Sequence, residues 1–202
     1  MRIAIIGAGR VGRALGTRWN DVGHDVVYGV RDPGDPKHAD LTGTARTEEA
    51  VRGADVVLIS LPWAATKETV SALDVGNAVV LDATNPLAVN AREMVADPTL
   101  AGAQLVSSWI GSSRVVKAFN CTGSANMADP DYPGQKPMMP VAGDDADARK
   151  VAIELANQIG FEAFDAGPLT AARDLEHLAV LWIRLAYQLG HGPDFAFGLL
   201  RR

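Results

Sequence analysis

Three glycines near the start of the chain have the spacing of a phosphate-binding turn. The apolar stretch Arg2 to Ile6 leads into this turn, and the amphipathic stretch Val11 to Val22 follows it. The turn reads Gly7, Ala8, Gly9, Arg10, Val11 and Gly12. Between a strand and a helix, such glycines allow a tight turn, close approach of a pyrophosphate, and close packing of the helix on the strand. Because a helix N-terminus favours anions, we expect a dinucleotide pyrophosphate to bind here.

The end of the next apolar run bears on which dinucleotide is bound. The run Asp25 to Gly29 predicts a second strand, and Val30 and Arg31 follow it. An NAD-binding protein usually carries an acidic side chain at this place, whereas an arginine can pair with a 2′-phosphate and stack on adenine. We therefore expect a preference for NADP(H). Asp32 keeps NAD(H) open as an alternative, because a shift of one residue would bring its carboxylate to the ribose.

Other basic residues could add to the same phosphate site. Lys37 and His38 lie on the segment Arg31 to Gly43, which lacks a regular pattern and is predicted to be a loop. Either could contact a 2′-phosphate, or simply lie in solvent. Arg10 and Arg13 would raise the local potential although the chain as a whole is acidic.

Polar and aromatic residues follow three further apolar runs, where the carboxyl ends of parallel strands would meet and form a ligand crevice. Leu61 ends the first of these runs and Pro62 and Trp63 follow it. Thr84, Asn85 and Pro86 follow the second run, and Asn120 follows the third. Asn85 could orient the nicotinamide carboxamide or ribose, or cap the turn before Pro86. Trp63 could form a wall for a ring of the cofactor or pack internally, and Lys117 could be structural.

The elements that would position these residues alternate along the chain, as in βαβ units on a doubly wound parallel sheet. The predicted strands are Arg2 to Ile6, Asp25 to Gly29, Asp55 to Leu61, Ala78 to Ala83, Arg114 to Phe119, Met138 to Ala142 and Phe161 to Phe164. The predicted helices are Val11 to Val22, Thr47 to Arg52, Ala65 to Ala72, Asp144 to Ile159 and Thr170 to Leu189. The last helix has an apolar stripe for the core or a dimer face. Cys121 to Pro137 is predicted to be a loop.

Composition narrows the function classes. The 202 residues, with a formal charge of −5, suit one soluble globular unit and argue against a nucleic-acid binder. A single cysteine, Cys121, excludes a disulfide framework, and the four histidines have no metal-ligand spacing. Asp144, Asp145 and Asp147 are interpreted as helix-capping residues. The apolar opening is too short for a membrane span or a signal-peptide core, so we expect a cytoplasmic protein.

Three later sequence segments show a resemblance to a known family. They are Asp82 to Pro86, Val116 to Asn120, and Asp165 to Arg173. With the glycine turn they resemble the NADPH-dependent coenzyme F420 reductases, over nearly the whole chain. The resemblance implies a Rossmann core at about residues 1–120 and a small C-terminal lobe at about 138–202 within one NAD(P)-binding unit, usually as a homodimer.

The resemblance further implies direct hydride transfer between the nicotinamide and a deazaflavin, coenzyme F420, without a catalytic side chain. Gly7, Gly9 and Gly12 match the family's pyrophosphate turn, and Arg31 matches its 2′-phosphate arginine. Ala8, Arg10 and Val30 depart from the archaeal pattern.

Alternative functions are a flavin, quinone or ferric reductase, and a nonenzymatic NADP(H)-binding redox sensor. Pyrroline-carboxylate reductases share the opening motif but need a large helical domain, for which the residues after Ala142 are too few.

Overall fold

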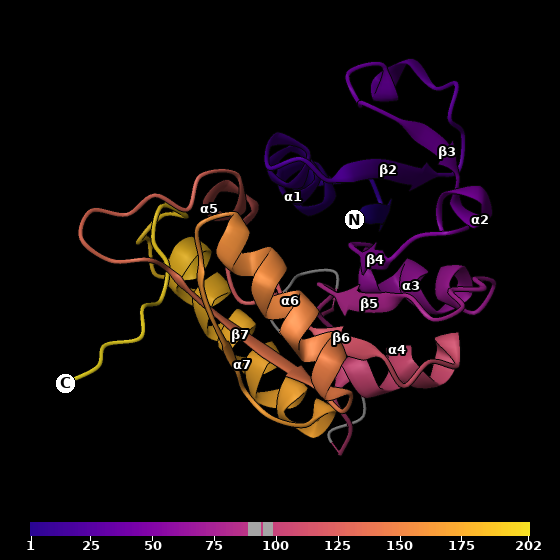
Figure 1. The fold of residues 1–202 in the computed structure, drawn as a ribbon. Helices are drawn as coiled ribbons and strands as arrows, with labels where there is room; N and C mark the ends of the chain where they lie inside the picture. The colour runs from indigo at the N-terminus through magenta and orange to yellow at the C-terminus, as the bar shows by residue number, and fades with distance from the viewer. Residues whose placement is uncertain (89–93, 95–98) are drawn as a thin grey trace.

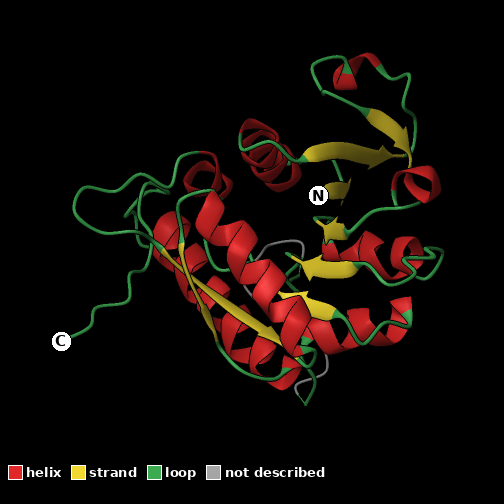
Figure 2. Cartoon of the chain, viewed as in Figure 1, coloured by secondary structure: helices red, strands yellow, loops and turns green. Residues whose placement is uncertain are grey.

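One mostly parallel sheet runs through the protein (Figures 1 and 2). The structure is a computed structural model that describes residues 1–88, 94 and 99–202. In these residues the strand order is β3-β2-β1-β4-β5-β6-β7-β8. The strands are β1 (Arg2–Ile6), β2 (Asp25–Val30), β3 (Thr44–Arg46), β4 (Val56–Ile59), β5 (Val79–Asp82), β6 (Val115–Lys117), β7 (Met138–Gly143) and β8 (Glu162–Asp165). This is a Rossmann-type doubly wound order, because the chain reverses its direction of travel between β1 and β4.

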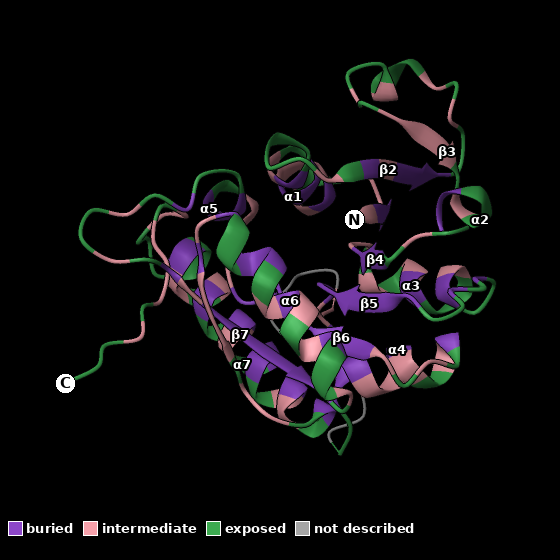
Figure 3. Cartoon of the chain, viewed as in Figure 1, coloured by how far each residue is buried: buried purple, intermediate pink, exposed green. Residues whose placement is uncertain are grey.

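The helices cover both faces of the sheet (Figure 2). They are α1 (Arg10–Asp21), α2 (Thr47–Ala50), α3 (Trp63–Val70), α4 (Gly102–Ile110), α5 (Ser124–Ala128), α6 (Ala146–Gln158) and α7 (Ala172–Ile183). One buried cluster unites α1 and α6 with the sheet, and the other unites α2, α3, α4 and α7 with its opposite face. The central strands are mostly apolar and are buried on both sides, and Figure 3 shows the burial of β4, β5 and β6.

The C-terminal lobe extends the same sheet. β7 pairs with β6 antiparallel, and β8 then pairs with β7 parallel. The segment after α7 returns to this lobe, where the Trp182 ring stacks on Phe195 at a centroid distance of 5.4 Å. Trp182 Nε1 donates to the Phe195 carbonyl oxygen at 2.9 Å, and Met138 N donates to the Phe197 carbonyl oxygen at 2.8 Å.

All seven predicted strands form, with ends that shift by up to two residues. The prediction missed β3, α4 and α5, and so was wrong in treating all of Cys121 to Pro137 as loop. The predicted helix Thr170 to Leu189 is three pieces: a 3-10 turn Leu169–Ala171, α7, and a π-helical turn Arg184–Gln188. The expected loop Arg31 to Gly43 contains a short 3-10 helix, η1 (Pro36–His38).

None of the helices in the described part of the chain is long and apolar enough to cross a membrane. Asp145 caps α6, since its side chain accepts a hydrogen bond from Ala148 N at 2.7 Å. This contact agrees with the interpretation of Asp145 as a capping residue.

Candidate functional site

The glycine turn joins β1 to α1, and nearby backbone atoms leave no room for a Cβ at two of its three glycines. Gly7 has a φ of +107°, and a Cβ there would lie 2.7 Å from the Ser60 carbonyl oxygen. A Cβ on Gly12 would lie 2.1 Å from the Gly7 carbonyl oxygen. A Cβ on Gly9 would have no heavy atom within 4 Å. Gly7 and Gly12 therefore make the turn possible, while Gly9 leaves space open at the N-terminus of α1, as a pyrophosphate requires.

One cavity of about 510 Å³ lies on the β2 side of the turn. The glycine turn, the ends of β2 and β3, the helix η1, α2 and α3 all contribute to its lining. Its lining includes the predicted site residues Gly7, Ala8, Val30, Arg31 and Leu61, and in addition His38, Arg46, Glu48 and Glu68. Its place beside the end of β2 is where the adenosine half of a dinucleotide binds in this fold.

A second cavity of about 370 Å³ lies over the ends of β4 and β5. It contains the predicted residues Val11, Leu61, Pro62, Trp63, Thr84 and Asn85. Leu61 lines both cavities, so they adjoin beside the glycine turn. Trp63 packs on Trp109 with a centroid distance of 5.3 Å, so its ring is both a wall of the cavity and part of the packing.

Not every predicted site residue lines these two cavities. Gly9 is exposed at the start of α1, and Gly12 is buried beneath the turn. Pro86 is buried, and Arg10 lines a separate groove between α1 and α5. The groove also contains Arg13 and Arg18.

Lys37, which the sequence predicts as a further contact to the 2′-phosphate, does not line the β2-side cavity. Its ammonium group pairs with Asp35 at 2.5 Å, and its side chain is 66% exposed. The neighbouring His38 lines the cavity instead, because η1 turns adjacent side chains in different directions. Arg46 lines it as well, and this residue was not predicted because β3 is short and not continuously apolar.

Asp32 is occupied in a local turn. Its Oδ1 accepts a hydrogen bond from Gly34 N at 3.0 Å, and Asp32 is not among the residues that line the β2-side cavity. Arg31 therefore reaches the cavity without a neighbouring carboxylate from its own loop.

Arg13 ties the glycine turn to η1. Its Nε donates to the Ala8 carbonyl oxygen at 3.0 Å and its Nη2 to the Lys37 carbonyl oxygen at 2.7 Å, while Nη1 pairs with Asp40. One guanidinium thus fixes two of the segments that surround the β2-side cavity.

Hydrogen bonds with Asn120 hold the side chain of Asn85 in place. Asn120 Nδ2 donates to Asn85 Oδ1 at 3.0 Å and to the Leu175 carbonyl oxygen at 2.9 Å, and Asn85 Nδ2 donates to the Asn120 carbonyl oxygen at 3.0 Å. Asn120 is buried and lines neither cavity. The side chain of Asn85 is therefore held by Asn120 rather than used as a cap of the turn before Pro86.

Beneath the second cavity lies a fully buried ion cluster of Lys117, Asp82 and Glu176. Lys117 Nζ lies 2.8 Å from Asp82 Oδ2 and 3.0 Å from Glu176 Oε1, and it donates to the Thr84 carbonyl oxygen at 2.6 Å. Burial lowers the pKa of Lys117, but the two carboxylates outweigh it and hold that pKa above its ordinary value. Lys117 is therefore charged and paired inside the fold.

The two carboxylates of this cluster also hold backbone in place. Asp82 Oδ1 accepts from Thr84 N at 2.9 Å and from Thr84 Oγ1 at 2.7 Å, which fixes a residue of the second cavity. Glu176 accepts from Gly102 N at 2.9 Å and Ala103 N at 3.2 Å, so α7 caps α4. Lys117 is thus structural, one of the roles that the sequence leaves open for it, and its partners Asp82 and Glu176 were not predicted.

Neither nucleophilic nor metal chemistry is suggested by the described residues. Burial raises the pKa of the Cys121 thiol to about 12, so the thiolate needed for nucleophilic attack is not formed near neutral pH. In the described ranges no group of three or more histidine, cysteine, aspartate or glutamate side chains could hold a metal ion.

The strand order of the sheet and the glycine turn define a Rossmann-type protein. Comparisons with known proteins identify its family. The family model described as "NADP oxidoreductase coenzyme F420-dependent" matches residues 2–86. The F420-dependent NADP reductase of Methanocaldococcus jannaschii is 34% identical over 154 residues, which cover 73% of this chain and 68% of that protein. The chain belongs to this family of NADP-dependent oxidoreductases.

Two further relatives extend the comparison. The crystal structure of a candidate F420-dependent NADP reductase from Arthrobacter sp. FB24 covers 100% of both chains at a TM-score of 0.79 and 27% identity. The metalloreductase STEAP3 of Rattus norvegicus is 26% identical over 178 residues, or 87% of this chain. The chain spans only 36% of that metalloreductase's length.

Proposed function

We propose that this enzyme transfers a hydride between NADP(H) and a deazaflavin coenzyme of the F420 type. The observation that carries the proposal is the pair of adjoining cavities beside the glycine turn, one of them lined by Arg31 and the other by Thr84 and Asn85. The similarity to the F420-dependent NADP reductase of Methanocaldococcus jannaschii supports the same acceptor.

The cavities divide the proposed binding roles between the two halves of NADP(H). The glycine turn would receive the pyrophosphate, and Arg31 the 2′-phosphate. Asn85, fixed by Asn120, would orient the nicotinamide half, and Trp63 would form a wall that excludes water from it. When bound, NADP(H) supplies the hydride chemistry itself, so the contribution of the chain is to position two rings and keep the site dry.

A hydride-transfer assay tests this proposal. The purified protein is mixed with NADPH and oxidised F420, and NADPH oxidation is followed by absorbance. We expect turnover with F420 and none when the deazaflavin is omitted. Absence of turnover with F420, under conditions where NADPH binding is measured directly, would contradict the proposed acceptor.

A second candidate acceptor is ferric iron, either directly or through a flavin. The match to a metalloreductase over 87% of this chain favours it. The same assay with ferric chelates and flavins separates the two: faster turnover with those acceptors than with F420 would select this candidate. No turnover with any acceptor, despite tight NADP(H) binding, would favour the redox sensor.

We also propose that the protein is a cytoplasmic homodimer. The chain has exposed apolar side chains near the end of α7, Leu181, Tyr187 and Leu189, which a second copy could cover. Leu175 and Trp182 of α7 are buried within the chain itself and are not available for this contact. Light scattering on the protein as it elutes from a size-exclusion column measures its mass, and the mass of a single chain would contradict the dimer.

A further inference from the structure

Two arginines on neighbouring strands line one cavity. Arg46 is the last residue of β3 and is paired in register with Val30, the last residue of β2, so Arg46 and Arg31 leave adjacent strand ends. Both line the β2-side cavity. Among the described residues, neither guanidinium has a hydrogen bond or an ion pair. Two arginines thus line one cavity, and neither forms an ion pair with a described carboxylate.

A third basic side chain faces the same cavity from a different element. His38 of η1 lines it, and His38 Nδ1 is buried without a hydrogen-bond partner in the described part of the chain. The position of η1 is fixed by Arg13, whose Nη2 donates to the Lys37 carbonyl oxygen. The unsatisfied nitrogen is therefore held in place by the fold.

Acidic side chains also contribute to this cavity but do not neutralise the arginines. Glu48 of α2 and Glu68 of α3 line it, and neither forms an ion pair with Arg31 or Arg46. Two unpaired guanidinium groups at adjacent strand ends repel each other, and a doubly charged phosphomonoester removes that repulsion where a ribose hydroxyl does not. The arrangement therefore favours a ligand with a phosphate at this point over one with a hydroxyl.

We propose that Arg46 is a specificity-determining residue that binds the 2′-phosphate of NADP(H) together with Arg31, with His38 as the third contact. This inference rests on the proposed function and adds to it a residue from a strand that does not belong to the β1–α1–β2 unit. A phosphomonoester has three acceptor oxygens, so two arginine forks and an imidazole can share it without competing for one oxygen.

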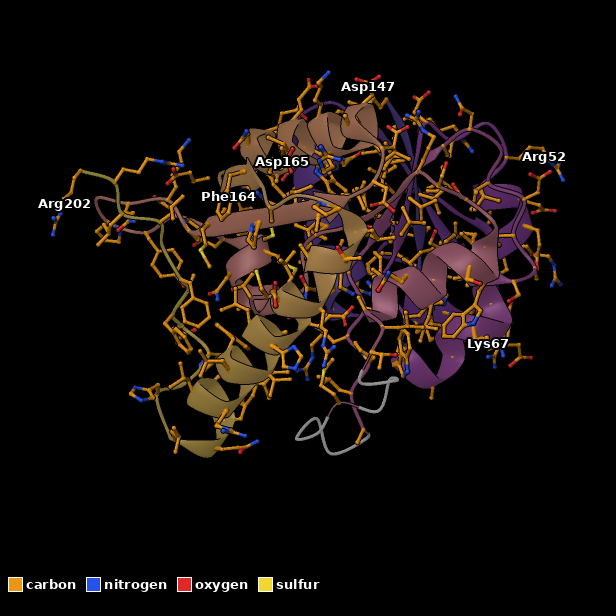
Figure 4. The ribbon with its side chains drawn as sticks, turned by 90° about the horizontal axis from the view of Figure 1, so that it is seen from below. Arg52, Lys67, Asp147, Phe164, Asp165 and Arg202 are labelled. Atoms are coloured by element: carbon orange, nitrogen blue, oxygen red, sulfur yellow. The ribbon has the colours of Figure 1, made fainter. Side chains whose placement is uncertain are left out.

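Direct binding of nucleotide fragments tests Arg46 apart from catalysis. The affinities of 2′,5′-ADP and 5′-AMP are measured by titration calorimetry for the wild-type chain, R46A and R52A. Arg52 is the matched control, because it is an exposed arginine outside the cavity that points away from the protein (Figure 4). Both variants lose one positive charge, but only R46A loses a side chain of the cavity.

We expect the wild-type chain to prefer 2′,5′-ADP. R46A should lower that preference by about ten- to a hundred-fold, as for loss of a charged hydrogen bond, whereas R52A should change it less than about two-fold. R46K keeps the charge without the planar fork and should fall between the wild-type chain and R46A. The side chain of Arg46 forms no cap to α2, so R46A should fold, which its circular dichroism spectrum and melting temperature check.

The outcomes separate this inference from the function on which it rests. A wild-type preference for 2′,5′-ADP that R46A retains in full would overturn the role of Arg46 and leave the proposed function standing. A wild-type chain that binds both fragments equally would overturn both the role of Arg46 and the NADP(H) selectivity. An equal loss in R46A and R52A would assign the effect to net charge and also overturn the role of Arg46.

Discussion

Arginine and lysine are used in opposite ways in two regions of this molecule. The ammonium group of Lys117 is fully buried and paired with Asp82 and Glu176 at 2.8 and 3.0 Å. Arg31 and Arg46 line an open cavity and have no acidic partner in the described structure. The difference teaches that a cation whose charge is already paired inside the fold serves the structure, while one left unpaired at a cavity is available to a ligand.

The largest expected effect comes from breaking the buried cluster. K117M leaves two carboxylates buried without their cation and should lower the free energy of unfolding by roughly 3–5 kcal/mol. Urea denaturation measures the change. K150M is the control, because Lys150 forms an exposed ion pair with Asp147 and should change stability by less than about 1 kcal/mol. If K117M were as stable as K150M, the buried cluster would not be the structural element that we describe.

Arg31 should give the reverse result, a loss of binding without a loss of stability. R31D should raise the dissociation constant of NADPH by about ten- to a hundred-fold, or ~1.5–3 kcal/mol, because a charged hydrogen bond is replaced by repulsion. Stability should change little, since Arg31 has no partner among the described residues. The ratio of NADPH to NADH affinity is the measurement, and an unchanged ratio would remove Arg31 from the phosphate site.

Alkaline pH offers a gentler test of the buried cluster. The pKa of Lys117 is raised in the folded protein, so the stability that this charge contributes is complete below its unfolded pKa of about 10.5. That contribution is lost as the pH rises through the higher folded value, at up to about 1.4 kcal/mol per pH unit. Urea denaturation from pH 9 to 11.5 should show a loss above about pH 10.5 that K117M does not share. A steeper loss in K117M than in the wild-type chain would contradict this assignment.

The smallest effect is expected at Lys37. Its side chain pairs with Asp35 and does not line the β2-side cavity, so K37A should leave NADPH affinity within about two-fold of wild type. Titration of K37A beside R46A compares two cations on the same side of the site. A larger loss in K37A than in R46A would restore Lys37 as the companion of Arg31.

The strands and the glycine turn could be predicted because their signals are local. Continuous apolar runs mark strands that are buried on both faces, and glycine spacing marks the turn. β3 escaped the prediction because its three residues, Thr44 to Arg46, are short and not continuously apolar. Arg46 was therefore not predicted as a site residue. It is brought next to Val30 by the pairing of β2 with β3, and the two residues are not close in sequence.

The buried cluster could not be predicted because its members are far apart in sequence. Lys117 lies 35 residues from Asp82, and Glu176 lies 74 residues from Gly102. A lysine in an apolar strand shows that a buried partner is needed, but not which carboxylate the fold will bring to it. Similarly, the choice between Lys37 and His38 depends on how η1 orients two adjacent residues, which no periodicity indicates.

The contact between Glu176 and the start of α4 has a consequence for synthesis on the ribosome. The first turn of α4 takes its cap from α7, and Lys117 obtains its second carboxylate from the same residue. A nascent chain that has emerged only as far as β8 has both strand ends of the second cavity but lacks this contact. The strands β1 to β6 can therefore pair early. The start of α4 and the ion cluster reach their final arrangement only when α7 has been synthesised.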